Sequence, residues 1–226
     1  QAASCILLGI VYAGYAWGTF KERWAHAAAW LFVAGGGLIA ISYSTGTGSL
    51  AARAALVALA YVLGERILFG LRRRSAIQPR TRAFVRLFWR LSHRPLLVAG
   101  WLTSIAVISI ALVRNLILLG GGRTQQIWAV VGLTLIVVLY ALSARLFRQA
   151  RFVWFATFLA FIPWTIMSNL GWLVTDRPRT SAFAVSWVVL VWLAYLIGWL
   201  VRRFAPLAYS LPLRIFAHLL LPFTLL

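Results

Sequence analysis

Acidic side chains are scarce in this sequence, and their scarcity limits the chemistry it can support. Only Glu22, Glu65 and Asp176 are acidic. The sequence therefore has too few carboxylates for paired-carboxylate catalysis, for a magnesium ion held by carboxylates or for a proton relay of acids. Glu65 is the best single candidate for function because it lies, with Arg66, inside an apolar stretch. Its simplest interpretation is an interfacial ion pair with Arg66 or a loop arginine, reaching toward water.

The three histidines, His26, His93 and His218, lie on separate segments without the spacing of metal ligands. We therefore expect no metal site. His218 lies deepest in an apolar stretch, where it could be an axial ligand of haem or a pigment if a neighbouring chain supplied the other ligand. A hydrogen-bonded packing histidine is the favoured interpretation, and no cofactor is predicted.

Small residues and proline interrupt two apolar stretches, at Gly35–Gly37 and at Pro163. A broken helix there could expose backbone carbonyls to a ligand, whereas close helix packing, also favoured by Gly14 and Gly18, is the alternative. Ser42 and Thr165 lie nearby. The candidate polar or ligand-binding residues are Glu65, Arg66, Arg114, Ser168 and Asn169.

Arg53 and Arg114 fall inside apolar stretches but within about five residues of an end, so their guanidinium groups can reach the headgroup layer. Asn115 beside Arg114 could mark a vestibule for an anionic headgroup. The net charge of +19 does not predict nucleic-acid binding, because the basic residues flank apolar stretches. Neither a glycine-rich phosphate loop nor a nucleophile elbow is present, so the sequence favours a protein without catalytic activity.

Hydropathy defines the elements that must position these residues. With 63% hydrophobic residues, mean hydropathy of +0.90 and 11% charged residues, the chain suits lipid rather than water. Continuous apolar runs, without strand-like alternation, predict an all-α bundle of about eight transmembrane helices. The predicted spans cover 3–20, 25–43, 50–71, 95–119, 126–142, 152–174, 181–201 and 205–226.

Basic residues collect in every other predicted loop. By this topology, 17 of the 22 Lys and Arg residues lie on one face. The positive-inside rule makes that face cytoplasmic, so we expect both termini outside, in a bacterial inner membrane. Because the chain starts with Gln1 and enters an apolar run at once, we also expect preceding residues, either a cleaved signal peptide or an earlier helix.

An internal repeat is indicated by matching segments, with chance similarity between apolar helices as the alternative. Tyr12-Ala13 aligns with Tyr140-Ala141, and the segment 59–64 (LAYVLG) aligns with 193–198 (LAYLIG). We therefore predict two parallel four-helix repeats, 1–119 and 126–226.

The longest basic loop contains a predicted amphipathic segment, 80–94. Phe84, Leu87, Phe88 and Leu91 recur at helical spacing, and an arginine occurs at every fourth position on another face. We expect this helix to lie in the headgroup layer, or else to bind a partner protein. The arginines predicted to contact lipid headgroups are Arg82, Arg86, Arg90 and Arg94.

These observations favour a non-catalytic, multi-pass structural or accessory subunit of a larger membrane assembly, with anionic lipids and other membrane subunits as partners. The alternative is a secondary transporter or lipid-handling carrier with a site between the two repeats. An enzyme acting on a lipid-linked phosphate is the third hypothesis.

Overall fold

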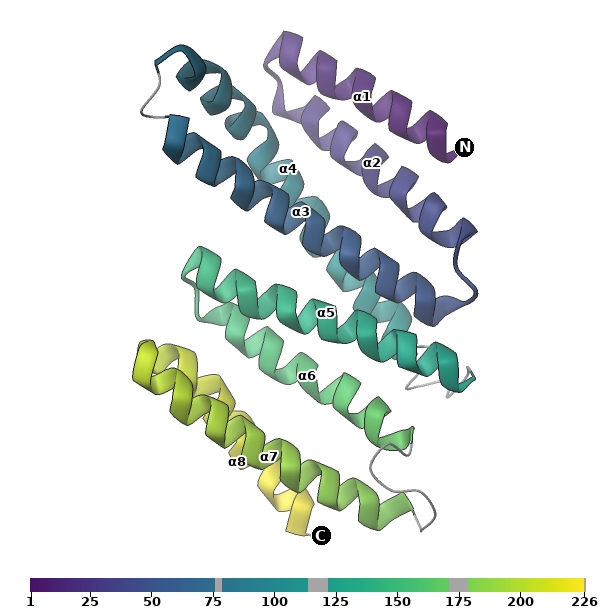
Figure 1. Ribbon diagram of the computed structural model, residues 1–226, viewed down its shortest axis with the longest axis vertical. Coiled ribbons are helices and arrows are strands. Elements are labelled where there is room, and N and C mark those ends of the chain that lie inside the picture. Colours follow the sequence, from purple (N-terminus) through teal and green to yellow (C-terminus); the bar gives the residue numbers. More distant parts are fainter. Residues whose placement is uncertain (76–78, 114–121, 171–178, 226) are drawn as a thin grey trace. The chain divides into compact units, whose positions relative to one another are not determined.

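The computed structural model describes residues 1–75, 79–113, 122–170 and 179–225, and in these ranges the chain forms helices joined by short turns (Figure 1). Side chains are described for 1–72, 85–113, 122–168, 170 and 185–222. In these ranges the helices are α1 (Ala2–Thr19), α2 (Glu22–Ser42), α3 (Thr47–Ser75), α4 (Pro79–Leu112), α5 (Arg123–Phe147), α6 (Arg151–Asn169), α7 (Arg179–Phe204) and α8 (Leu207–Leu225).

Seven of these helices, α1–α7, are long and apolar enough to cross a membrane, and α8 contains a shorter apolar segment, Leu207–Pro222. A helix satisfies its own backbone hydrogen bonds, which hydrocarbon cannot do, so helices are the expected form for these runs. The prediction of an all-α membrane protein is confirmed. Eight crossings stay a prediction.

Helix α4 differs most from the sequence prediction. The span was predicted to begin at Pro95, after a separate amphipathic helix, but Pro79–Leu112 form one helix of 34 residues with Pro95 inside it. At about 1.5 Å per residue such a helix is about 51 Å long, against about 30 Å of hydrocarbon. Segment 80–94 is therefore a continuation of the span rather than a helix of its own, because proline removes a single hydrogen bond and the neighbouring turns remain.

Helix α2 is also continuous, so Gly35–Gly37 do not break it. A Cβ atom on Gly35 would lie 2.8 Å from Ile6 Cγ1 and 3.3 Å from the Ala2 carbonyl oxygen. Gly9 is similarly covered by the Phe32 ring at 3.0 Å, whereas Gly14 and Gly18 have no such neighbour within 4 Å. The glycines that allow α1 and α2 to approach each other are therefore Gly9 and Gly35, rather than Gly14 and Gly18.

The chain divides into two compact units, Gln1–Ile110 and Ala111–Leu226. In unit 1, α1 and α2 form a hairpin, α3 packs on α2, and Gly100 of α4 lies against Tyr61 and Val62 of α3. In unit 2, α5 packs on α6, α7 packs on α8, and α6 contacts both α7 and α8. The core of that α6–α8 cluster consists of Leu190, Val191, Ala194, Phe216 and Ala217. The tandem repeat stays a prediction.

The contact at Gly35 can be tested against Gly37, two residues along the same helix. We expect Gly35→Ala to lower the free energy of unfolding by about 1–3 kcal/mol, because the added methyl group overpacks the α1–α2 contact. Gly37→Ala meets no atom within 4 Å, so we expect it to be neutral or to add up to about 1 kcal/mol through helix propensity. Denaturant titration in detergent micelles, followed by circular dichroism, measures both. Equal effects of the two substitutions would contradict the close approach.

Candidate functional site

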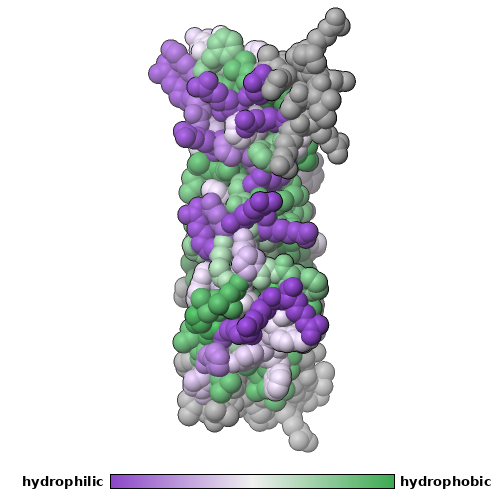
Figure 2. Space-filling model, turned by 90° about the vertical axis from the view of Figure 1, so that its left-hand side faces the viewer, coloured by the Kyte–Doolittle hydropathy of each residue, from purple (hydrophilic) through white to green (hydrophobic). Residues whose placement is uncertain are grey.

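Basic turns lie at one end of each unit. In unit 1, Arg94 Nη1 is 3.9 Å from Glu22 Oε2, which brings the basic half of α4 beside the α1–α2 turn. In unit 2, Trp164 Nε1 donates to the Ser186 carbonyl oxygen at 3.0 Å, so the last turns of α6 lie beside the first turns of α7. The two helices therefore run antiparallel, and the basic start of α6 lies at the same end of the unit as the basic end of α7. Figure 2 shows hydrophilic residues exposed among hydrophobic ones on one face of the molecule. That the basic end of each unit is cytoplasmic stays a prediction.

Glu65 has a different environment from the one that its neighbour Arg66 suggested. Its side chain is 1% exposed, and Oε1 accepts a hydrogen bond from Nδ1 of His93, on α4, at 2.7 Å. Arg66 Nε is 3.4 Å from the other carboxylate oxygen, close enough for an ion pair but without hydrogen-bond geometry. The acid is therefore buried and bound to a second helix rather than directed toward water.

The His93 ring connects this pair to a group of aromatic and basic side chains. Trp89, one turn earlier on α4, stacks on His93 with ring centres 4.6 Å apart and planes at 24°. The Arg72 guanidinium of α3 lies 4.1 Å from the centre of the Trp89 ring. Glu65, His93, Trp89 and Arg72 thus form a continuous series of contacts between α3 and α4.

An arginine-rich cleft opens beside this series. We call it the arginine cleft; its volume is about 360 Å³, and among the side chains that the structure describes, three arginines and no acid line it. Guanidinium groups bind phosphate and carboxylate oxygens through paired N–H donors, so the cleft suits an anionic group. Its lining residues are Arg72, Arg86, Leu87, Trp89 and Arg90.

Two of the four arginines predicted to contact headgroups, Arg86 and Arg90, line the cleft. The Arg82 side chain lies outside those that the structure describes. Arg94 instead faces Glu22. The sequence did not single out Arg72, which enters the cleft from α3; its membership in a basic run at a span end was the only available signal.

A second acid cluster joins α2 to α4. Glu22 lies 3.8 Å from His26 Nε2, one turn along α2, and 3.9 Å from Arg94 Nη1. Its side chain is 38% exposed, so water screens these charges in part, although the Oε1 atom that faces His26 is itself buried. The cluster is an interfacial tether rather than a buried site.

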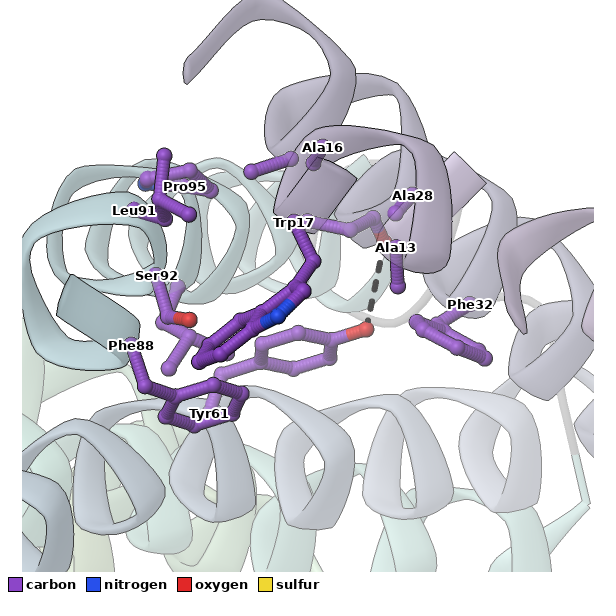
Figure 3. A pocket seen from close by; sticks show the side chains of 13 residues that line it. Ala13, Ala16, Trp17, Ala28, Phe32, Tyr61, Phe88, Leu91, Ser92 and Pro95 are labelled. Atoms are coloured by element: carbon purple, nitrogen blue, oxygen red, sulfur yellow. Dashed lines mark hydrogen bonds between the residues drawn. The ribbon is translucent and has the colours of Figure 1, made fainter. Parts of the chain in front are cut away.

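An apolar cavity of about 190 Å³ lies among α1, α2, α3 and α4 of unit 1 (Figure 3). The rings of Trp17, Phe32, Tyr61 and Phe88 line it together with small alanine side chains. Tyr61 Oη donates a hydrogen bond to the Ala29 carbonyl oxygen at 3.2 Å, so its polar end is satisfied. Dry apolar cavities of about 150 Å³ bind molecules of the size of benzene, so this one can hold an apolar ligand or part of an acyl chain.

The candidate polar residues of α6 make structural hydrogen bonds in unit 2. Ser168 Oγ donates to the Trp164 carbonyl oxygen at 2.9 Å and lies 2.9 Å from Ser186 Oγ on α7. Thr165 Oγ1 donates to the Phe161 carbonyl oxygen. The Asn169 side chain, Arg114 and Asn115 lie outside the described parts of the chain.

His218 meets a tyrosine of the neighbouring helix. Its Nε2 lies 2.6 Å from Tyr195 Oη on α7, and the two rings are edge to face. His218 is exposed on α8, and Tyr195 is half-buried on α7. That His218 binds no cofactor stays a prediction.

Comparison with known protein families, with curated proteins and with solved structures found no match to this chain. Within the described ranges, no three His, Cys, Asp or Glu residues are placed to hold a metal ion. The arginine cleft, with the buried Glu65–His93 pair beside it, is the candidate site that the geometry supports.

Because Glu65 is buried, the free energy of unfolding should depend on its partner His93. His93→Leu leaves the carboxylate buried with a weaker set of partners, so we expect the free energy of unfolding to fall by about 3 kcal/mol. The double variant Glu65→Leu/His93→Leu removes both groups and is expected to recover at least half of that loss, because a buried ion pair can be replaced by apolar side chains.

His26→Leu is the matched control, since its partner Glu22 is partly exposed. We expect it to change the free energy of unfolding by less than about 1 kcal/mol. Denaturant titration in one detergent compares these three variants with the unchanged protein. A His93→Leu effect no larger than that of His26→Leu would show that Glu65 is not held by His93.

Proposed function

We propose that this protein is a lipid-handling membrane protein that binds the anionic headgroup of a phospholipid in the arginine cleft. The observation that carries the proposal is that Arg72, Arg86 and Arg90, from two helices, line one cleft whose described lining contains no acid. Three arginines at one cleft concentrate positive charge where a phosphate would lie.

The neighbouring side chains suit a headgroup at a membrane interface. Trp89 and Leu87 supply an apolar wall beside the three cations, and tryptophan prefers the level of the headgroups because its ring is apolar and its N–H is polar. Helix α4 is long enough to carry Arg86 and Arg90 past the end of the hydrocarbon while its later turns remain inside.

The apolar cavity is a second surface of unit 1 that suits part of a lipid. The cavity and the cleft use different residues of α4, such as Phe88 and Arg90, so the helix presents an apolar site on one face and a basic site on another. A lipid combines an anionic group with apolar chains, and both kinds of surface occur in unit 1. This combination ranks lipid handling ahead of the accessory-subunit role that the sequence favoured.

Lipid selectivity tests the proposal. We expect the triple variant Arg72→Gln/Arg86→Gln/Arg90→Gln to lower affinity for phosphatidylglycerol by about 10- to 100-fold, because each arginine contributes about 1 kcal/mol near an anionic surface. Affinity for phosphatidylcholine is expected to stay unchanged. Native mass spectrometry of the protein released from detergent micelles, titrated with each lipid, measures both affinities.

The matched control is Arg145→Gln/Arg148→Gln/Arg151→Gln, which removes the same charge from exposed positions of unit 2. We expect it to leave the tightest phosphatidylglycerol site within about twofold of the unchanged protein. Equal losses in the two triple variants would show that net charge rather than the cleft determines binding. If the chain is instead an accessory subunit, fixed partner proteins should co-purify with it in the same preparation.

A further inference from the structure

We propose that the Glu65–His93 pair is a proton-binding site that strengthens anion binding in the arginine cleft. The inference rests on the proposed function and adds its regulation. In the step itself, the His93 imidazole takes one proton from bulk water and becomes an imidazolium, and no other bond forms or breaks.

The geometry gives His93 both an acidic partner and access to water. On one side, Nδ1 bonds to a carboxylate that is 1% exposed. On the other side, 31% of the His93 side chain is exposed, so protons can exchange with water. Imidazole is also the side chain that ordinarily changes charge between pH 5 and pH 8.

Direct contacts carry the charge of His93 to the cleft. Trp89 lines the cleft, and its ring stacks on His93 at 4.6 Å while the Arg72 guanidinium lies 4.1 Å from the same ring. Arg90 of the cleft is three residues before His93 on α4, so the two lie on neighbouring parts of one helix face. A charge gained by His93 is therefore gained beside the anion-binding groups.

Other charged groups near His93 do not reproduce its position. From α3, Arg66 faces Glu65 at 3.4 Å, and arginine keeps its charge throughout this pH range. From α2, Glu22 and His26 form the separate cluster with Arg94, outside the lining of the cleft. Tyr61 of α3 bonds to the α2 backbone. The α1 sequence 2–19 contains no Asp, Glu, Lys, Arg or His.

The sign of the effect follows from reciprocity between the two sites. An anion in the cleft attracts the imidazolium and therefore favours protonated His93, so a proton on His93 must favour the anion by the same factor. We expect binding to be tighter at pH 5.5 than at pH 8.0, by about fivefold, which is near the lower end of typical coupling between sites.

Phosphatidylglycerol is the appropriate probe because its phosphodiester keeps one negative charge across this range, whereas a phosphomonoester changes charge near pH 6. Its affinity for the purified full chain in nanodiscs of phosphatidylcholine is measured at pH 5.5, 6.5, 7.25 and 8.0. The unchanged protein should lose about fivefold in affinity across the series. In His93→Gln, which keeps a hydrogen-bonding side chain without a charge, affinity should be independent of pH and equal to the value of the unchanged protein at pH 8.0.

His26→Gln is the matched control, since it removes a histidine that also pairs with a glutamate but lies outside the cleft. It should retain the full fivefold dependence. Because the chain has three histidines, nuclear magnetic resonance of protein labelled with nitrogen-15 histidine can follow His93 directly, with His93→Gln assigning its signal. That signal should report proton uptake between pH 8.0 and pH 5.5, without any lipid probe.

The outcomes separate the two proposals. If phosphatidylglycerol binds in the cleft with the same affinity at every pH, or if His93→Gln keeps the pH dependence, the proton linkage is overturned and the lipid site stands. A His93 signal that does not change with pH also overturns the linkage. If the triple arginine variant binds phosphatidylglycerol as well as the unchanged protein does, the lipid site falls, and the regulation proposed for it falls with it.

Discussion

Hydrocarbon offers no hydrogen-bond partner to a polar group, and most of this structure follows from that constraint. The backbone satisfies it by forming helices, which stay continuous through Pro95 and Pro163. Hydroxyl side chains satisfy it locally, by donating to carbonyl oxygens of their own helices. Such bonds are made by Ser42, Thr103, Ser104, Ser109, Thr165 and Ser210. Polar residues inside the spans are therefore mostly structural, and few remain to recognise a ligand.

Glu65 differs, because its carboxylate has no hydroxyl hydrogen with which to donate to a carbonyl oxygen of its own helix. Burial of a charge is unfavourable by several kcal/mol unless opposite charge and hydrogen-bond donors surround it. Arg66 of the same helix supplies opposite charge, and His93 on α4 supplies a hydrogen bond to Oε1. The same requirement fixes α4 against α3, since His93 must lie opposite Glu65, and it thereby places Trp89 and the nearby arginines. A buried charge thus organises a polar site between α3 and α4.

The arginines show how one composition can serve two purposes. Collected at helix ends, they are predicted to meet anionic headgroups and to orient the chain in the membrane. Where α3 and α4 bring three of them around one cleft beside Trp89, the same side chains form a concave site of defined shape. Such a site can distinguish one lipid from another, which scattered surface charge cannot do.

Hydropathy and residue spacing were enough to predict the helical membrane class, most helix bounds to within a few residues, and the placing of Arg86 and Arg90 on one face of a helix. Hydropathy and helical period are local properties, so they can be read along the chain. Tertiary structure decided that Glu65 meets His93, 28 positions away, that Arg72 joins the cleft from another helix, and that Gly35 rather than Gly14 allows close packing. These contacts depend on the rotation and axial register of neighbouring helices, which many distant side chains set together and which no local period in one helix encodes.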